Sequence, residues 1–172
     1  MQVQSFQPHV LGHERILVLG SMPGVASLQQ QQYYAHPRNI FWRLMDELFA
    51  VDQSLAYSQR LRAISNQGLA LWDVYQQCFR PGSLDSAIDK QQASFNRIAE
   101  LLKAQPSIRY IACNGQAAFK AMQRYVKLHH AELTELSFEL FCLPSTSPAN
   151  AGMSYQHKLN AWLLLRELLE ER

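Results

Sequence analysis

Residues 20–42 read GSMPGVASLQQQQYYAHPRNIFW, and the order of patterns in and around this stretch decides the fold class. Before it comes the apolar run RILVL at 15–19, which is typical of a buried strand. After it, apolar residues recur at helical spacing from Ile40 to Phe49. The stretch itself begins as a glycine–proline turn and continues as a polar, aromatic loop. The sequence therefore predicts a strand, a tight turn, a loop and a helix, with the loop at the end of the strand where open α/β sheets bind ligands.

The rest of the chain alternates in the same way. Apolar runs predict strands at residues 15–20, 68–75, 108–113 and 138–143. Helical spacing predicts helices at 39–49, 54–66, from a cap at Ser94 to 105, after Gly115, and at 154–169. Residues 1–14 and 79–85 read as irregular segments. We therefore expect one domain over residues 1–172, an α/β fold with three α/β/α layers around a central, mostly parallel four-stranded sheet.

Composition limits the functional classes. A hydrophobic share of 48% and a charged share of 17% are those of a folded protein. No apolar run reaches the roughly 18–20 residues that span a bilayer, and the first residues do not resemble a signal peptide, so we expect a cytoplasmic protein with no membrane partner. Three widely spaced cysteines suit buried thiols better than a disulfide framework or a metal site, so no metal or cofactor is expected. The net charge of +2 is compatible with a nucleic-acid partner.

Three segments follow predicted strands and should converge at one edge of the sheet: residues 20–39, Asn114-Gly115, and residues 143–152. Residues 20–24 could expose backbone N–H groups to an anion or simply form a type II turn, and they lack the pattern of a nucleotide-binding loop. Because a helical pattern follows Asn114-Gly115, this pair predicts a strand-to-helix junction and not a hairpin.

The side chains in these segments each have two interpretations. Tyr33 and Tyr34 could stack on a planar ligand or pack in the core. His36 could act as a general acid or base or lie at the surface. Asn114 offers a donor and an acceptor to the edge of a flat ligand. The hydroxyls of residues 145–147, between two prolines, could hold a phosphate or belong to an ordinary loop.

Taken together, these stretches resemble the uracil-DNA glycosylase superfamily, and within it the hypoxanthine-DNA glycosylase branch. The GSMPG turn at 20–24 is similar to the family's first motif. The segment YAHPRNIFW at 34–42 is similar to the aromatic-Ala-x-Pro-x-Asn-x-Phe-Trp motif of mismatch-specific members. The segment LPSTSP at 143–148 is similar to the last motif. The resemblance covers nearly the whole chain, and 33–42 is its most specific part.

The resemblance implies a role for each matching position. A nucleotide flipped out of DNA would stack on Tyr34, be read by Asn114 and lose its base with the help of Asn39. The residues implied to line the base pocket are Gly20, Ser21, Met22, Pro23, Gly24, Tyr34, Phe41 and Asn114. Those implied to contact DNA are His36, Arg38, Ser145, Thr146, Ser147 and Asn150. The residue that wedges into the duplex in relatives would lie near Ala149 or Asn150.

Two positions depart from most relatives. Met22 stands where many relatives have an Asp or Asn that handles water, and Leu143 stands where many have a His. The hypoxanthine branch shares both absences, which leaves the catalytic role to Asn39. We therefore predict a monomeric, monofunctional glycosylase that removes hypoxanthine from DNA containing deaminated bases, with weaker action on uracil. The alternatives are a mismatch-specific uracil/thymine glycosylase and a noncatalytic nucleic-acid-binding module of the same fold.

Overall fold

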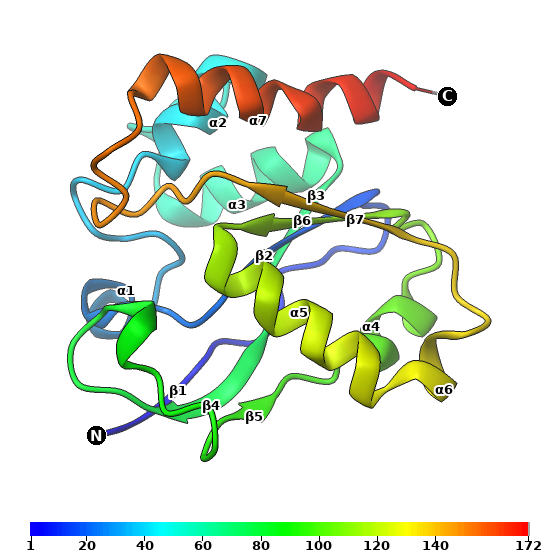
Figure 1. Cartoon of the computed structure of the whole chain (residues 1–172). Helices are drawn as coiled ribbons and strands as arrows, with labels where there is room; N and C mark the ends of the chain where they lie inside the picture. Colours follow the sequence, from blue (N-terminus) through cyan, green and yellow to red (C-terminus); the bar gives the residue numbers. More distant parts are fainter. Residues whose placement is uncertain (172) are drawn as a thin grey trace.

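The computed structural model describes residues 1–171 and has two sheets (Figure 1). The main sheet is parallel throughout, in the order β3-β2-β6-β7, which confirms the predicted central sheet. Its strands are β2 (Ile16–Gly20), β3 (Leu69–Asp73), β6 (Tyr110–Asn114) and β7 (Glu139–Leu143). The second sheet is antiparallel and consists of β1 (Gln2–Gln4), β4 (Tyr75–Phe79) and β5 (Ser94–Phe95).

The helices connect the parallel strands and cover both faces of the main sheet (Figure 1). They are α1 (Val25–Gln30), α2 (Phe41–Phe49), α3 (Tyr57–Gln67), α4 (Ile98–Ala104), α5 (Gln116–Leu128), α6 (His130–Leu133) and α7 (Tyr155–Glu170), with a 3-10 turn η1 (Asp85–Ala87). Because no helix within residues 1–171 is both long and apolar enough to cross a bilayer, the described chain holds no candidate membrane-spanning helix.

Alternation along β2 divides the core in two. Leu17 and Leu19 point into a cluster with α4 and α5, whereas Ile16 and Val18 point into a cluster with α2, α3 and α7. All four of these side chains are completely buried. A sheet that is covered by helices on both sides needs strands that are apolar on both faces. The helices, the sheet and the second group of helices form the predicted three layers.

The second sheet corrects several local predictions. Residues 2–4, predicted to be irregular, form β1. The strand predicted at 68–75 ends at Asp73, and residues 75–79 form β4 of the second sheet. Ser94, predicted to cap a helix, lies in β5, and the helix begins after Arg97. Strands of two or three residues are too short to show a two-residue period, so only their pairing defines them.

Two predicted helix ends agree with the observed caps, whereas α2 begins at Phe41 and α3 at Tyr57, two and three residues later than predicted. Gly68 ends α3 in the left-handed region, with φ of 105°, and the Ser154 hydroxyl accepts a hydrogen bond from the His157 N–H at the start of α7. Cys78 and Cys113 are buried free thiols, as predicted, and Cys142 is half-buried.

Candidate active site

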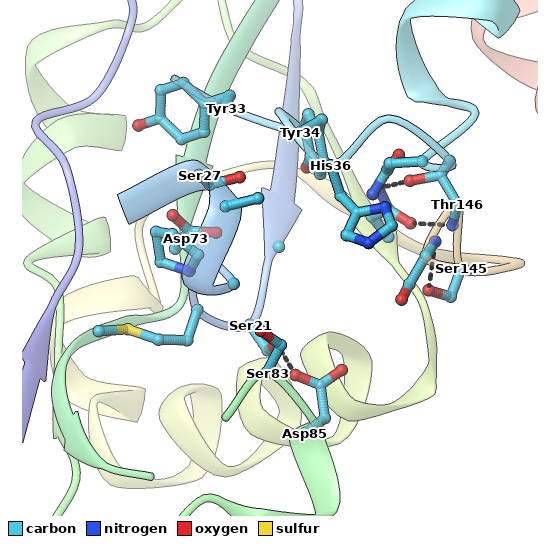
Figure 2. A pocket seen from close by; sticks show the side chains of 18 of the residues that line it. Ser21, Ser27, Tyr33, Tyr34, His36, Asp73, Ser83, Asp85, Ser145 and Thr146 are labelled. Carbon is cyan, nitrogen blue, oxygen red and sulfur yellow. Dashed lines mark hydrogen bonds between the residues drawn. The ribbon is translucent and has the colours of Figure 1, made fainter. Parts of the chain in front are cut away.

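The carboxyl ends of all four parallel strands border one cavity of about 130 Å³. A single water needs only about 10–15 Å³, so the cavity has room for a larger, planar group. It lies beside β2, where the sheet order reverses and α/β proteins bind ligands. Residues from all three predicted loops line it, together with Asp73, Ser83 and Asp85, which sequence reasoning did not select. Figure 2 shows these side chains around one hollow.

The structure brings most predicted pocket residues together. Those lining the cavity are Gly20, Ser21, Met22, Pro23, Gly24, Tyr34, His36, Asn39, Asn114, Ser145, Thr146 and Ser147. Arg38 and Asn150 do not line it. Phe41 does not line it either: it is completely buried and stacks under Tyr34, with ring centroids 4.1 Å apart. Phe41 therefore supports the aromatic wall from behind.

Tyr34 has an unusual backbone for a bulky residue, with φ of 57° in the left-handed region. Its side chain packs on Phe41, and its buried hydroxyl has no hydrogen-bond partner within the described chain. Burial, together with the nearby Asp73, raises the pKa of the Tyr34 phenol, and the adjacent Asn114 side chain partly opposes this rise, so the hydroxyl stays protonated. Tyr34 therefore offers the cavity an unused donor and acceptor.

The two asparagines are partly engaged by the protein. The Asn39 side-chain oxygen accepts the Phe41 backbone N–H at 3.0 Å. Asn114 makes two bonds to Thr146, donating to its hydroxyl and accepting from its backbone N–H, both at 2.9 Å. Each carboxamide still has hydrogen-bonding capacity, because an amide group has two N–H donors and two acceptor lone pairs.

Asp73 lies at the end of β3, among completely buried neighbours, and its Oδ2 atom has no partner within the described chain. Desolvation raises the pKa of Asp73 to about 7; Asp85 adds to this effect and Arg80 opposes it. A neutral carboxyl can both donate and accept a hydrogen bond. The signal available in the sequence was one acidic residue in the otherwise apolar run LALWDV.

Gly20 makes room for Asp73. A Cβ atom at position 20 would lie 2.5 Å from Asp73 Oδ1 and 3.5 Å from the Tyr34 hydroxyl. Position 20 therefore requires glycine because β3 and the loop that carries Tyr34 come too close to leave room for a side chain. The backbone angles of Gly20 do not themselves require glycine.

Met22 and Leu143, the two positions at which the sequence departs from the resembled motifs, are buried in the two core clusters, with 6% and 4% of their surfaces exposed. Neither can orient water or hold an anion. No group of three or more His, Cys, Asp or Glu side chains is placed to bind a metal within residues 1–171. The polar side chains that line the cavity are the amides of Asn39 and Asn114, several hydroxyls, the His36 imidazole and the carboxyls of Asp73 and Asp85.

The loop after β7 is fixed from two sides. The indole N–H of Trp162 donates to the Pro144 carbonyl at 2.9 Å, and Lys158 Nζ donates to the Asn150 carbonyl at 2.8 Å. From α2, the Ile40 backbone N–H donates to the Thr146 carbonyl at 3.1 Å. The segment that carries Asn39 is thus joined directly to the segment that carries the three hydroxyls.

The profile of the Uracil DNA glycosylase superfamily matches residues 8–166, nearly the whole chain. The chain belongs to this superfamily. As a member of the superfamily it is a DNA glycosylase, a hydrolase of N-glycosyl bonds, and its substrate is DNA.

Individual relatives agree with this placement. The chain is 31% identical, over 94% of its length and 96% of the relative's, to a hypoxanthine DNA glycosylase of Methanosarcina barkeri. It is 35% identical, over 81% of its length and 82% of the relative's, to a hypoxanthine DNA glycosylase of Methanosarcina acetivorans. The solution structure of a candidate uracil DNA glycosylase from Methanosarcina acetivorans superposes with a TM-score of 0.80 at 30% identity, over 98% of this chain and 99% of that one.

Proposed function

We propose that this glycosylase removes hypoxanthine from DNA and acts more weakly on uracil. The observation that carries the proposal is the lining of the cavity, which includes the Asn114 amide and two buried groups without a hydrogen-bond partner within the described chain, the Tyr34 hydroxyl and Asp73 Oδ2. Buried polar groups without partners are costly, so they favour a ligand that supplies the missing hydrogen bonds. The names of the two Methanosarcina relatives support hypoxanthine as that ligand.

The chemistry of the base fits these groups. Hypoxanthine carries a carbonyl acceptor beside a ring N–H donor, and a carboxamide pairs with this edge through two hydrogen bonds. Uracil presents the same pair, whereas adenine reverses both groups. Asn114 therefore favours the deaminated bases over adenine, and a neutral Asp73 adds a second group that can donate as well as accept.

Asn39 is assigned to the chemical step. Breaking the N-glycosyl bond develops positive charge on the sugar and negative charge on the departing base. Amide and backbone N–H donors fixed around the base stabilise that negative charge without a strong general base. The bond from Phe41 to the Asn39 oxygen fixes the orientation of the amide, which leaves its NH₂ group for the substrate.

DNA containing the base would lie across the rim of the cavity. His36, Arg38, Ser145, Ser147 and Asn150 are proposed to hold the sugar and phosphates. Thr146, also predicted to contact DNA, is buried and bonded to Asn114 instead. Within residues 1–171, no Lys or Arg lines the cavity itself, which suits a pocket that receives a base. The protein is proposed to act as a cytoplasmic monomer without a metal or cofactor.

The test is incubation with duplexes that differ in one base: inosine opposite cytosine, uracil opposite guanine, thymine opposite guanine, and adenine opposite thymine. Release of free hypoxanthine with an abasic site, at a rate above that for uracil and with none for adenine, is expected, with and without EDTA. Faster release of uracil or thymine would instead favour a mismatch-specific enzyme. Binding without release of any base would favour the noncatalytic alternative.

A further inference from the structure

Three residues that line the cavity carry side-chain N–H donors within the described chain: His36, Asn39 and Asn114. The two asparagines are assigned to the chemical step and to the edge of the base, whereas the ring of His36 has no assigned contact with the base. Figure 2 shows this imidazole pointing into the hollow that the cavity-lining side chains surround. Within residues 1–171, His36 is also the only basic side chain that lines the cavity.

One hydrogen bond determines which ring nitrogen of His36 carries the hydrogen. The Arg38 backbone N–H donates to His36 Nδ1 at 3.1 Å. A ring nitrogen that accepts a hydrogen bond has no hydrogen of its own, so the neutral imidazole carries its hydrogen on Nε2. No group within the described chain forms a hydrogen bond with Nε2. The Nε2–H group is therefore a donor that is available to a ligand.

The segment around His36 is held on both sides. Before it, the Ala35 N–H donates to the Ser27 hydroxyl at 3.1 Å. After it, the Asn39 N–H donates to the His36 carbonyl at 2.9 Å, so the imidazole and the Asn39 amide belong to one tight turn. A donor that is held in place before the substrate arrives stabilises developing charge without a cost of reorganisation.

The end of β7 offers no equivalent donor. Leu143 has 4% of its surface exposed and packs in the core cluster of α2, α3 and α7. Beyond it, the Ser145 hydroxyl accepts the Ser147 N–H at 3.2 Å, which is a bond within its own loop. The segment that carries His36 is therefore better placed to supply a fixed N–H donor to the base.

We propose that His36 is a catalytic residue that donates its Nε2–H to N3 of hypoxanthine as the base departs. This inference rests on the proposed function. When Asn114 pairs with the O6 and N1–H edge, N3 remains free beside the glycosidic bond. Uracil has its O2 atom in the equivalent position, so one donor serves both bases. A contact of the same ring with the sugar is compatible with this role, because N3 lies on the sugar side of the base.

The step is hydrolysis, and His36 keeps its proton throughout. The electron pair of the C1′–N9 bond passes to the base as that bond breaks, and N3 takes part of the resulting negative charge. Water forms the new C1′–O bond, and the proton that it loses ends on the released base. A fixed N–H donor at N3 stabilises the charge that develops in the transition state, as donors in an oxyanion hole do.

The first experiment measures single-turnover release of hypoxanthine from inosine opposite cytosine. His36→Ala should be slower by about 10²-fold, the usual effect of one lost donor. His36→Gln reaches the Nε2 position with an amide N–H and should keep most of the rate. His36→Asn reaches only the Nδ1 position, where its oxygen accepts the Arg38 N–H, and should be as slow as His36→Ala. His130→Ala is the control, because His130 is exposed on α6. Thermal melts show whether each variant is folded.

The second experiment removes the acceptor from the substrate. In 3-deaza-2′-deoxyinosine a C–H group replaces N3. The wild type should release this base more slowly than hypoxanthine, and His36→Ala should release it at the wild-type rate, because the contact is already absent. A role of His36 in the folding of the loop would instead slow both substrates by the same factor.

A third measurement does not depend on cleavage. Nitrogen-15 spectra of histidine-labelled protein, recorded at about pH 8, where imidazoles are normally neutral, should show the His36 hydrogen on Nε2. The signal is assigned by its loss in His36→Gln. A duplex with 2′-fluoro-2′-deoxyinosine, whose glycosidic bond resists cleavage, should shift the Nε2 hydrogen downfield as it enters a new hydrogen bond.

Either of two results would overturn the proposal. One is wild-type excision by His36→Asn together with slow excision by His36→Gln, which leaves only the bond of Nδ1 to Arg38. The other is an equal loss by His36→Ala on inosine and on its 3-deaza analogue. A wild type that binds the uncleavable duplex with the expected shift but releases no hypoxanthine would count against the proposed function and not against the contact.

Discussion

At the scale of single residues, Asn39 and Asn114 are each placed so that a structural role and a role toward the base are both available. Each is half-exposed at the cavity and gives part of its hydrogen-bonding capacity to a neighbour, Phe41 for Asn39 and Thr146 for Asn114. A structural role alone predicts lost stability, whereas the proposed roles predict lost activity. Substitutions that separate these two quantities therefore test the assignment.

We expect Asn39→Ala to slow single-turnover release of hypoxanthine by about 10²–10³, the usual effect of removing one preorganised donor. Binding of the intact duplex should change little, because Asn39 is assigned to the chemical step. Asn114→Ala should instead impair inosine and uracil together. Asn114→Asp should be worse at pH 7, because a carboxylate has no donor and repels the departing anion. Thermal melts beside the rates show whether each variant is folded.

The contrary outcome is equally specific. If both side chains only hold their local backbone, each alanine variant should lose about 0.5–2 kcal/mol of stability, as a lost cap does, and cut normally once folded. A folded Asn39→Ala protein with wild-type excision contradicts the catalytic assignment.

The buried carboxyl of Asp73 should make the stability of the protein depend on pH. Burial raises its pKa from 3.8 to about 7, so the folded protein keeps a proton that the unfolded chain loses. The contribution of this group to stability is therefore complete below the unfolded pKa and is lost as pH rises through the folded pKa. Between these two values, the free energy of unfolding of the wild type should fall more steeply with pH than that of Asp73→Asn, by about 1.4 kcal/mol per unit at most.

Urea denaturation at several pH values measures this difference. Asp52→Asn is a suitable control, because the Asp52 carboxyl is exposed and its hydrogen bonds to Ser54 lower its pKa, the opposite direction. Parallel pH curves for wild type and Asp73→Asn would contradict a raised pKa. If the neutral form serves the base, wild-type excision should also decline above pH 7, whereas Asp73→Asn should show no such decline.

At the scale of elements, the site depends on how closely the ends of β2 and β3 approach. The two strands stay paired up to Gly20 and Asp73, and the Val74 N–H continues the contact by donating to the Gly20 carbonyl at 2.8 Å. The turn after β2 therefore starts from a fixed point, with no space for a side chain between the strands.

We expect Gly20→Ala to lower stability by about 1–3 kcal/mol, as overpacking usually does, because its Cβ would force Asp73 and the Tyr34 hydroxyl to move. Excision should fall more than stability explains, since both displaced groups line the cavity. Gly152→Ala is the matched control, because a Cβ at position 152 would meet nothing within 4 Å. Equal excision by the two folded variants would mean that the close approach at Gly20 does not shape the site.

At the scale of the whole molecule, positive charge is modest and partly used internally. Among the basic residues, Arg43 lies over the Tyr155 ring at 3.6 Å, Arg60 over the Trp42 ring at 4.6 Å, and Arg80 is buried. The chain has 16 Lys and Arg side chains against 14 Asp and Glu, so its net charge of +2 attracts DNA phosphates only weakly. The protein should therefore hold DNA largely through backbone groups and hydroxyls.

The salt dependence of DNA binding measures how many phosphates the protein neutralises. Affinity for duplex DNA should fall as salt rises, with a logarithmic slope that corresponds to fewer than about six neutralised phosphates. Arg38→Gln, which removes an exposed cation beside the cavity, should reduce the slope by about one. A slope near zero for the wild type would mean that phosphates are not bound at all.

The sequence by itself determined the main sheet, most of the helices that cover it and most of the pocket, but not α1 (Val25–Gln30), which forms within the predicted loop. Strands that are buried on both faces appear in the sequence as continuous apolar runs, and the apolar residues of a helix recur every 3.6 residues. Local sequence patterns were therefore sufficient to predict β2, β6, α5 and α7. Parallel strands also end at one edge, which brings residues 20–39, Asn114 and residues 143–152 together once the sheet is assumed.

Only the tertiary structure decided the rest, because pairing and burial are properties of residues far apart in the chain. The pairing of Gln2–Gln4 with residues 77–79 supplies hydrogen bonds that no local sequence pattern predicts. Asp73 reads as one acidic residue after an apolar run, and its place in the cavity follows from the pairing of β3 with β2. Local propensity specifies which elements form, whereas the chemistry of the site depends on which of their ends meet.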